Sequence, residues 1–544
     1  MSNSSRALAA LLAGTLFVPA CGDEPPRVNV VLISIDSLRQ DHLGCYGHKA
    51  EFAPDLPVSP NIDALAAVGV LFGEAWSTSS WTLPAHMSIF TGLDDAAHGV
   101  SADDFRLDPL RATLPEELAD AGYTTGGFYS GPYLDPKYGF GRGFDSYTSA
   151  MASAAGIAAE IARLNAERTA QGGQPLAPAE VAAFRDRLSH RDVTSPRVNE
   201  LGLEFLAEHA GKEPFFLFLH YFDVHYDYTP PAELAAAFDP DYSGWLDGSN
   251  WYFDPRVWDR ENRRPVLSQR DLRHALALYD AEIHWVDRHV GAVVQALKDA
   301  GVWDDTLLVL TADHGDEFFE RGGIGHRSTL YAEQLRVPLV LKLPAGDRAG
   351  ARPAALARAY DLAPTILDYA GYGALPEARG RSLRTAIEGG GEAKVSALGR
   401  IVAGPQPIDA WRDERFTVIR PLEFDRQALL RERRLVSRPL EDAGGRPVFE
   451  VYDRDADPRE LGPPLAPDDP GRQAAIDAFC RDFAAARDQD LRMLISPLAD
   501  RYAPDKTDEE AATLAALGYV GGNEPSGGQR RFPPIAPFPS PCRR

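Results

Sequence analysis

The sequence predicts an α/β fold with a doubly wound, mostly parallel sheet and a small antiparallel subdomain towards the C-terminus. Two short apolar runs, residues 28–35 and 307–312, stop abruptly at Asp36 and Asp313. Runs of this kind are typical of parallel strands that are buried on both faces. Between residues 28 and 400, strand-like stretches also alternate with helix-like ones, which indicates that helices cover both faces of one sheet.

The main elements follow in chain order. Residues 59–69 carry a serine cap, an early proline and a terminal glycine, which together predict a complete helix. Residues 113–122 repeat this pattern. We expect buried strands at 214–220 and 338–344, and a long helix over 270–301 whose apolar side chains recur along one stripe.

Residues 150–200 interrupt this alternation. They are rich in alanine and in charged residues, show helical periodicity and contain a break at Gly172-Gly173. We expect them to form a helical insertion that covers the main sheet and roofs its site. Residues 28–400 are then expected to form one catalytic domain around this insertion.

After residue 400 the apolar runs become shorter and strand-like. We expect residues 401–490 to form a small antiparallel subdomain. The tail, residues 491–544, is proline-rich from Gly521 onwards, which predicts disorder in its last part. The elements expected in the subdomain are strands near 415–419, 434–436 and 448–452 and a helix at 471–487.

The chain is strongly acidic, with a formal net charge of −23 at pH 7 and an isoelectric point near 5.0. Nucleic acids and anionic membrane surfaces are bound through basic patches, so this charge argues against both as partners. A small anionic substrate would need a local cation to offset the acidic field. A bound metal ion is the simplest source of that charge.

The N-terminus is typical of an export signal. Arg6 precedes an apolar stretch over residues 7–18, which is too short to span a bilayer stably. The signal segment, residues 1–21, ends in Pro19-Ala20-Cys21, which resembles the bacterial lipoprotein box and implies a lipid on Cys21. We expect an exported protein, anchored in the cell envelope or located in the periplasm, with plain secretion as the alternative. That lipid is the expected contact with a membrane.

Besides Cys21, the chain contains Cys45, Cys480 and Cys542. If Cys21 carries a lipid, three cysteines remain, and they cannot all pair within the chain. Their spacing does not match a metal-binding motif, which argues against a thiolate-bound metal.

Polar residues gather where the two apolar runs end. In open α/β sheets, ligands bind outside the carboxyl ends of the strands, so Asp36, Asp313 and His314 are expected to point at one site. Carboxylate oxygens combined with imidazole suit Zn²⁺ or Mn²⁺, whereas the histidine disfavours Ca²⁺ and Mg²⁺. The alternative is that Asp36 caps a helix and that His314 has a structural role.

Thr82 lies between these two runs in the sequence. Pro84 follows it, and residues 85–92 have a helical pattern that ends at glycine, so Thr82 is expected at a helix N-terminus. The free N–H groups of a helix N-terminus attract anions such as phosphate and sulfate. A threonine hydroxyl becomes a competent nucleophile when a metal stabilises its alkoxide. The alternative is that Thr82 only caps the helix.

Two further polar clusters follow predicted strands or loops. In residues 220–227, His225 is placed to bind an anionic oxygen or to protonate a leaving group, and Asp223 with His225 is an alternative ligand pair for a second metal. In the glycine-rich residues 322–327, His326 is a candidate proton donor or substrate contact, and Arg327 is a candidate partner for an anion. Both clusters could instead be ordinary polar loops. Asp316 and Glu317 are expected to shape their loop rather than to bind metal.

Seven motifs occur along the chain in a characteristic order. They are residues 30–47 (VVLISIDSLRQDHLGCYG), 59–65 (SPNIDAL), 311–317 (TADHGDE), 325–331 (GHRSTLY), 336–339 (RVPL), 361–367 (DLAPTIL) and 451–458 (VYDRDADP). With these motifs the chain resembles the sulfatase family, within the alkaline phosphatase superfamily. The resemblance spans roughly residues 28–490 and implies a sulfatase-like α/β fold and a hydrolase of phosphate or sulfate esters.

The chain departs from the sulfatase pattern at the nucleophile. Sulfatases carry Cys-x-Pro-x-Arg, whose cysteine is converted to formylglycine, whereas the matching residues here are Thr82-Leu-Pro84-Ala-His86. Threonine cannot be converted to formylglycine, and the arginine partner has become a histidine. We expect His86 to orient Thr82.

Other positions depart in the same direction. The usual paired aspartates are Asp36-Ser37 here, so one metal ligand is missing, and the usual Asp-Asn is Asp313-His314. The lysine and histidine of the sulfatase Gly-Lys-Trp-His motif fall near Ser130 and Pro132, which cannot bind sulfate as cations. These changes resemble the phosphoesterase and phosphotransferase members, in which a threonine attacks directly.

The chemistry of the nucleophile favours phosphorus over sulfur. A formylglycine hydrate releases sulfate by breaking its own C–O bond, whereas a threonine ester must be cleaved by water at the transferred group. That second route is the familiar one for phosphoryl transfer to a metal-stabilised alkoxide.

We therefore hypothesise a metal-dependent hydrolase that cleaves small phosphate or phosphonate esters. The divalent ion is Mn, Zn or Ca, with a second ion as an open option. A sulfuric ester hydrolase, a phosphotransferase and an inactive binding protein are the alternatives. The hypothesised residues are Asp36, Thr82, Asp313 and His314 as metal ligands, Thr82, His86, His225 and His326 as catalytic residues, and His225, His326 and Arg327 as substrate-binding residues.

Overall fold

The computed structural model describes residues 28–490, apart from short gaps, together with residues 504 and 542. The predicted signal segment with Cys21, and nearly all of the tail after residue 490, lie outside the described residues. The gaps are residues 152–153, 171, 178–180, 182–193, 250, 253, 260–263, 374, 391–394, 403–406, 425–436, 441 and 444–447.

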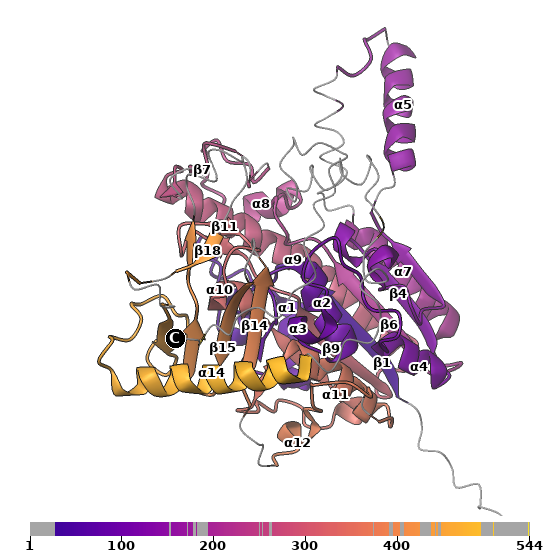
Figure 1. Cartoon of the computed structure of the whole chain (residues 1–544). Coiled ribbons are helices and arrows are strands. Elements are labelled where there is room, and N and C mark those ends of the chain that lie inside the picture. Colours follow the sequence, from indigo (N-terminus) through magenta and orange to yellow (C-terminus); the bar gives the residue numbers. More distant parts are fainter. Residues whose placement is uncertain are drawn as a thin grey trace, which may run out of the picture.

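A seven-stranded sheet forms the centre of the molecule (Figure 1). Its order is β2-β12-β9-β1-β6-β4-β5, in which β9, β1, β6, β4 and β5 run parallel, while β12 pairs antiparallel with β9 and β2 with β12. The predicted mostly parallel sheet is thus confirmed. The strands are β1 Asn29–Ile35, β2 Val70–Leu71, β4 Thr124–Tyr129, β5 Ser146–Ser149, β6 Phe215–Tyr221, β9 Thr306–Ala312 and β12 Leu339–Lys342.

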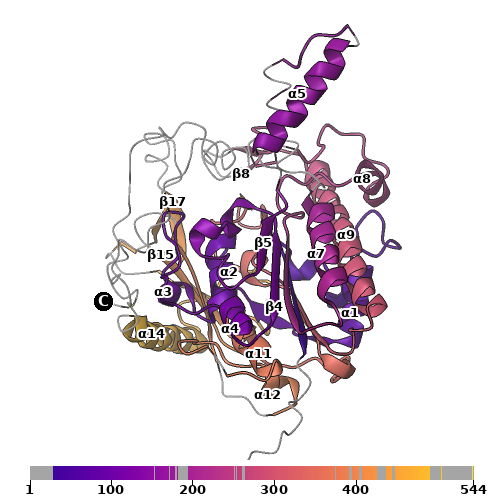
Figure 2. The same ribbon diagram turned by 90° about the vertical axis from the view of Figure 1, so that its right-hand side faces the viewer.

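Helices cover both faces of this sheet (Figure 2). One face carries α1 (Pro60–Val68), α7 (Thr194–His209) and α9 (Gln269–Asp299), and α7 and α1 both pack against α9. The other face carries α2 (Thr82–Thr91), α4 (Leu114–Asp120) and α11 (Leu362–Tyr369). The predicted double winding is therefore present. Its physical reason is that apolar strands buried on both faces need a helical layer on each side.

Local capping explains where the long helix α9 begins. Ser268 accepts a hydrogen bond from the Asp271 backbone N–H, and the Asp271 carboxylate accepts one from the Ser268 backbone in return. This reciprocal pair satisfies donors that a helix N-terminus otherwise leaves without partners. The apolar stripe of α9 is buried as predicted, with Leu278, Ile283 and Val290 among its core residues.

Small elements complete the fold. The short strands and helices are β3 Glu74–Trp76, β7 Trp258–Asp259, β8 Arg264–Pro265, β10 Glu317–Phe318, β11 Ile324–Gly325, β13 Leu356–Arg358, β17 Leu422–Phe424, β18 Ser437–Pro439, α3 Asp95–His98, α8 Ala232–Phe238, α10 Ala332–Leu335 and α12 Arg384–Ile387. The 3-10 turns are η1 Gln40–His42, η2 Gly44–Tyr46, η3 Pro132–Leu134, η4 Pro136–Tyr138, η5 Pro344–Gly346 and η6 Ala359–Asp361.

The helix α5 (Ala154–Ala170) lies in the range expected to form a helical insertion. It projects away from the body of the molecule in both views (Figures 1 and 2) rather than lying across the sheet. Several stretches of 150–200 lie outside the described residues, so the expected roof over the site stays a prediction. In the described part of the chain, no helix combines the length and the apolar character needed to cross a membrane.

The C-terminal part forms a separate antiparallel sheet, as predicted. Its order is β14-β15-β16-β19, with β14 Ala397–Val402, β15 Pro407–Arg412, β16 Phe416–Ile419 and β19 Glu450–Asp453. The helix α14 (Pro470–Asp490) covers it and closes a second small core that includes Trp411, Val418 and Phe479. The strand expected at 434–436 lies outside the described residues.

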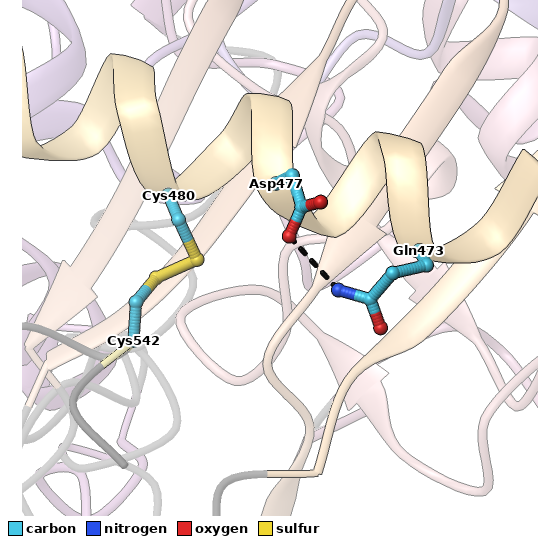
Figure 3. The surroundings of a disulfide bond; sticks show 4 residues. All are labelled: Gln473, Asp477, Cys480 and Cys542. Carbon is cyan, nitrogen blue, oxygen red and sulfur yellow. Dashed lines mark hydrogen bonds between the residues drawn. A yellow bond between two sulfur atoms is a disulfide. The ribbon is translucent and has the colours of Figure 1, made fainter.

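A disulfide bond links α14 to the end of the chain (Figure 3). It joins Cys480 to Cys542, and on the same helix Gln473 Nε2 donates to Asp477 Oδ1 at 2.9 Å. Cys45 is the free cysteine of the described residues. The disorder predicted for the rest of the proline-rich tail lies outside the described residues and stays a prediction.

A buried ion pair connects the C-terminal sheet to the main domain. Arg412 on β15 pairs with Glu460, and both side chains are almost fully buried. Arg412 also donates to the Leu330 carbonyl, and Glu460 accepts from the Ala332 backbone N–H. The two side chains therefore fix the segment around residue 330 against the small sheet.

Replacing Arg412 with methionine is expected to destabilise the protein by about 3–5 kcal/mol, because Glu460 would keep a buried charge without its cation. Urea unfolding measures the change. The matched control is R415M on the same sheet, where the pair with Asp453 is exposed and screened by solvent. R415M should leave the midpoint unchanged, and an equal loss in both variants would contradict this interpretation.

Candidate active site

The carboxyl ends of three neighbouring strands meet at one edge of the sheet. In the register of the sheet, Ile35 of β1 lies opposite Tyr221 of β6 and Ala312 of β9. Asp36 and Asp313 are the next residues along their strands, so both carboxylates emerge at the same level. His314 follows directly, and all three side chains are buried. The structure therefore brings together the residues that the sequence predicted for one site.

Thr82 lies beside this group, as predicted. It is the first residue of α2, and its hydroxyl donates to Asp36 Oδ2 at 3.3 Å. The N-cap residue is Trp81, and its side chain makes no capping hydrogen bond. The hydroxyl of Thr82 is thus directed at the strand ends rather than used as a helix cap, and Asp36 does not cap a helix either.

Backbone N–H groups bind one carboxylate oxygen of Asp313, and the other oxygen faces the site. Its Oδ1 accepts from the backbone N–H groups of Ser37 at 3.2 Å and His314 at 2.8 Å. Its Oδ2 has no hydrogen-bond donor among the described residues, and His314 Nε2 lies 3.4 Å away. A buried carboxylate oxygen in this position is available as a metal ligand.

His220 joins the site from the end of β6. Its Nδ1 lies 2.6 Å from the Ser130 carbonyl, and its Nε2 lies 3.5 Å from Asp36 Oδ2. A carbonyl can only accept, so Nδ1 carries the proton and Nε2 presents a lone pair. His314 is arranged in the same way, with Nδ1 bound to the Gly315 carbonyl at 3.1 Å and Nε2 3.7 Å from Asp36 Oδ1.

Burial sets the charge state of these groups. It raises the pKa of Asp36 to about 6 and of Asp313 to about 7, with the neighbouring Asp36 charge also raising that of Asp313. Burial lowers the pKa of His220 to about 4 and also lowers that of His314. The imidazoles are therefore neutral, and the carboxyl groups lack a positive charge that would favour their ionised form.

These residues fit a divalent cation. The lone pairs of His220 Nε2 and His314 Nε2 face carboxyl oxygens, and neither nitrogen has a hydrogen-bond partner within the described ranges. Asp36, Asp313 and His314 offer ligand atoms that all lie within 4.8 Å of one another. A mixed oxygen and imidazole set of this kind suits Zn²⁺ or Mn²⁺.

His86 contacts the backbone of Thr82 rather than its hydroxyl. Its Nδ1 donates to the Thr82 carbonyl at 3.0 Å, and its Nε2 accepts from Ser34 Oγ at 2.9 Å. Burial lowers the pKa of His86 to about 3, so the ring is neutral. The contact of His86 with Thr82 is therefore made to the backbone in the first turn of α2 and not to the Thr82 hydroxyl, and the predicted orienting role of His86 stays a prediction.

His225 and His326 lie together at the border of this group. Their ring centroids are 4.9 Å apart, and the His326 ring lies 4.3 Å from that of His314. His225 Nδ1 is 2.5 Å from the Tyr226 carbonyl, and His326 Nδ1 is 2.7 Å from Asp316 Oδ1. The Nδ1 atoms therefore hold the protons, and in the neutral rings Nε2 is the basic nitrogen.

Arg327 is held by aromatic side chains. Its guanidinium carbon lies 4.0 Å above the ring centroid of Trp81, and its Nη1 donates to the Tyr133 hydroxyl at 3.1 Å. Its backbone is in the left-handed region, with φ of 64°, and its N–H donates to the Ser80 carbonyl. The cation is thus placed beside the residue that precedes Thr82, and its predicted pairing with an anion stays a prediction.

Three acidic residues of the polar clusters have distinct surroundings. Asp223 accepts from the Ser195 and Thr194 hydroxyls at the start of α7, and Glu317 accepts from backbone N–H groups of its own loop. Asp316 instead lies with His314 and His326 in a group with the spacing of metal ligands. Both Asp316 and Glu317 are expected from the sequence to shape their loop. The contacts of Glu317 fit that expectation, whereas Asp316 lies among possible metal ligands.

Sequence reasoning did not select His220 and Asp316 for the site. His220 ends an apolar strand run, and a histidine in that position was the available signal. Its side chain reaches Asp36 because Ser34 and His220 are paired in the sheet register. Asp316 lies in the 311–317 motif, but its surroundings depend on Tyr228, which donates to Asp316 Oδ2 at 2.7 Å from a distant segment.

The fold and the site define the class of α/β ester hydrolases of the alkaline phosphatase superfamily. The sulfatase family model matches residues 28–372, which is more than half of the chain. The chain therefore belongs to the sulfatase family. As a member, it is an ester hydrolase that acts on sulfate or phosphate esters, and this family generally binds a divalent metal ion.

Similar proteins carry both kinds of name. The multifunctional alkaline phosphatase superfamily protein PehA of Trinickia caryophylli is 27% identical over 400 residues, covering 66% of this chain and 76% of that protein. The N-acetylglucosamine-6-O-sulfatase of Bacteroides thetaiotaomicron is 21% identical over 582 residues, covering 94% of each. The crystal structure of the phosphonate monoester hydrolase of Agrobacterium radiobacter has the same fold, with a TM-score of 0.58, 21% identity and coverage of 85% of this chain and 96% of that chain.

Removing divalent ions is expected to lower the melting temperature, because the carboxylates and lone pairs at the strand ends would lose their shared counter-charge. Adding back Mn²⁺ or Zn²⁺ at about 100 times its Kd should restore about 2.7 kcal/mol. Thermal unfolding with and without a chelator measures this. The response should shrink in D313N and persist in D299N, which alters an exposed carboxylate at the end of α9. An undiminished response in D313N would argue against the site.

Proposed function

We propose that this protein hydrolyses phosphate or phosphonate esters with Thr82 as the nucleophile. The observation that carries the proposal is the contact of the Thr82 hydroxyl with Asp36 Oδ2, 3.3 Å apart, at the N-terminus of α2. The sulfatase family uses a cysteine-derived formylglycine at this position, and a threonine cannot form one. The nucleophile of this chain is therefore an ordinary hydroxyl.

The reaction has two steps, transfer of the phosphoryl group to Thr82 and hydrolysis of the resulting ester. The Thr82 oxygen attacks phosphorus, the P–O bond to the leaving alcohol breaks, and the departing oxygen takes a proton. Water then attacks the same phosphorus and the bond to Thr82 breaks, which returns a proton to its oxygen. Both steps cleave at the transferred group, which suits phosphorus and matches the known use of hydroxyl nucleophiles in covalent catalysis.

The resident cation would be held by Asp36, Asp313, His314 and Thr82. His220 is a further candidate ligand, because its Nε2 lies 3.5 Å from Asp36 Oδ2. When bound, a divalent ion stabilises negative charge on the nucleophile and on the transferred group. We propose Zn²⁺ or Mn²⁺ for this role, because imidazole accompanies the carboxylates. His314, Asp316 and His326 are the candidate ligands for a second ion, because their ligand atoms lie within 4.8 Å of one another.

The remaining polar residues bind and move protons. The tautomers fixed by the Tyr226 carbonyl and by Asp316 leave Nε2 of His225 and of His326 as basic nitrogens. Burial lowers the pKa of His326 well below its usual value, so its ring is neutral and its Nε2 can accept a hydrogen bond from the hydrolytic water. His225 is then the candidate donor to the leaving group, once its Nε2 has taken up a proton. Arg327, held by Trp81 and Tyr133, is the candidate partner for the anionic oxygens.

The comparisons include hydrolases of phosphorus esters and hydrolases of sulfate esters. The name of PehA describes a multifunctional member of the alkaline phosphatase superfamily, and a phosphonate monoester hydrolase has the same fold. Sulfatases are prominent among the similar proteins. The substrate class therefore needs a direct test on matched esters.

The test compares initial rates on aryl phosphate, phosphodiester, phosphonate and sulfate esters in Zn²⁺ and in Mn²⁺. We expect a phosphorus ester to be the best substrate. T82V keeps the shape of the side chain but lacks the hydroxyl, so kcat should fall at least about 1,000-fold, the scale on which loss of a nucleophile acts. T82S keeps the hydroxyl and should retain measurable turnover.

Mass spectrometry of acid-quenched reactions provides an independent readout. We expect a substrate-derived group on Thr82 in the wild type and none in T82V, while thermal unfolding verifies that both variants are folded. Wild-type turnover by T82V would refute the proposed nucleophile. A sulfate ester cleaved faster than every phosphorus ester would refute the substrate class and leave the nucleophile intact.

We further propose that the protein acts outside the cytoplasm as a lipoprotein anchored through Cys21, which lies outside the described residues. The support is the lipobox-like Ala20-Cys21-Gly22 after a short apolar segment. We expect the full-length wild type to be recovered with membranes and the C21S variant to be recovered in the soluble exported fraction. A wild type that fractionates like C21S would contradict the lipid anchor.

A further inference from the structure

A second group of metal-ligating side chains lies outside the candidate active site. His42 ends η1, His48 follows η2, and Asp280 lies within α9. His42 Nδ1 is 2.7 Å from Asp280 Oδ1, and His48 Nε2 is 3.0 Å from Oδ1 and 2.9 Å from Oδ2 of the same carboxylate. Three ligand atoms thus converge from segments that are far apart in the sequence.

The loop geometry holds the two imidazoles in place. Gly47 has φ of 99°, a left-handed conformation in which other residues are strained, and it turns the chain so that His48 faces back towards α9. The His48 backbone N–H donates to the Leu43 carbonyl, and the Cys45 backbone N–H donates to Asp63 Oδ1 at 2.6 Å. Both histidines are therefore presented by a hydrogen-bonded turn.

The carboxylate of Asp280 is buried and paired with two imidazoles. Its side chain is 4% exposed, and within the described ranges its ion-pair partners are His42 and His48, with no lysine or arginine among them. A buried carboxylate is costly unless it is well paired. A divalent cation bound to the same three groups would add a full positive charge beside this buried carboxylate.

We propose that His42, His48 and Asp280 bind a Zn²⁺ ion at a site separate from the Asp36 and Asp313 centre. Two imidazoles and one carboxylate form a zinc donor set that leaves a fourth position for water. With zinc–ligand distances of about 2.0–2.2 Å, tetrahedral ligand atoms lie about 3.4 Å apart, so the rings must move outward by roughly half an ångström. His48 is 19% exposed, which gives the ion and its water a path from solvent.

The proposed ion would connect the segment after β1 to α9. Tyr279, next to Asp280, donates to the Ser37 carbonyl at 2.7 Å and accepts from the Arg39 backbone N–H at 2.8 Å. The site therefore lies next to the backbone that follows Asp36. A metal bound there crosslinks that backbone to the long helix and does not take part in the chemistry at Thr82.

The test measures how much Zn²⁺ each protein holds. Metal-stripped wild type, H48A and D280N are titrated with Zn²⁺ against a chromophoric chelator at neutral pH, and bound zinc is counted after gel filtration. We expect H48A and D280N to hold one Zn²⁺ fewer per chain than the wild type, with H48A retaining near wild-type hydrolysis. The matched control is H209A, which removes a histidine of similar exposure, 22%, that pairs with Glu213. H209A should bind as much zinc as the wild type.

Variants at the other centre separate this inference from the proposed function. D313N should lose metal at the strand ends and keep the ion held by His48. Co²⁺ added to folded D313N should then give visible ligand-field absorption that is weaker in D313N/H48A, which keeps the test valid if D280N does not fold. Equal zinc content in wild type, H48A and D280N, or Co²⁺ spectra unchanged by H48A, would overturn the proposal.

Discussion

The central constraint on the structure is that two carboxyl groups and two neutral imidazoles are buried together at the carboxyl ends of β1, β6 and β9. Asp36 and Asp313 meet the bare Nε2 atoms of His220 and His314, and within the described residues no lysine or arginine pairs with these carboxylates. In a medium of low polarity such a group persists only with protonated carboxyls or with a shared cation. The strand register therefore sets the spacing of these carboxyls and imidazoles and makes a bound cation favourable between them.

Backbone carbonyls determine which nitrogen of each histidine can act. The Nδ1 atoms of the histidines around the site face the carbonyls of Thr82, Ser130, Gly315 and Tyr226, and that of His326 faces Asp316. Each contact places the proton on Nδ1 and directs the basic nitrogen elsewhere. Orientation of metal-binding and catalytic imidazoles by a second layer of acceptors is a general device in such sites. Here the acceptors are mostly main-chain groups, so the tautomers follow from the fold itself.

Interactions well away from the strand ends hold the surrounding loops. Arg412 and Glu460 attach the C-terminal sheet to the segment around Leu330, a few residues after Arg327. Trp81 connects that arginine to the start of α2 through its ring face. The small C-terminal subdomain is thus a part of the support for the loop that carries Arg327, although none of its described residues joins the group around Asp36.

The sequence by itself determined the strand ends at Asp36 and Asp313, the helix that begins at Thr82 and the sulfatase-like order of motifs, because each depends on short-range patterns of apolar runs, caps and spacing. Only the tertiary structure decided that His220 and Asp316 join the site, that His86 binds a carbonyl, and that Cys480 pairs with Cys542. Those outcomes depend on sheet register and on contacts between segments far apart in the chain, and no local pattern encodes which distant partner a buried polar side chain meets.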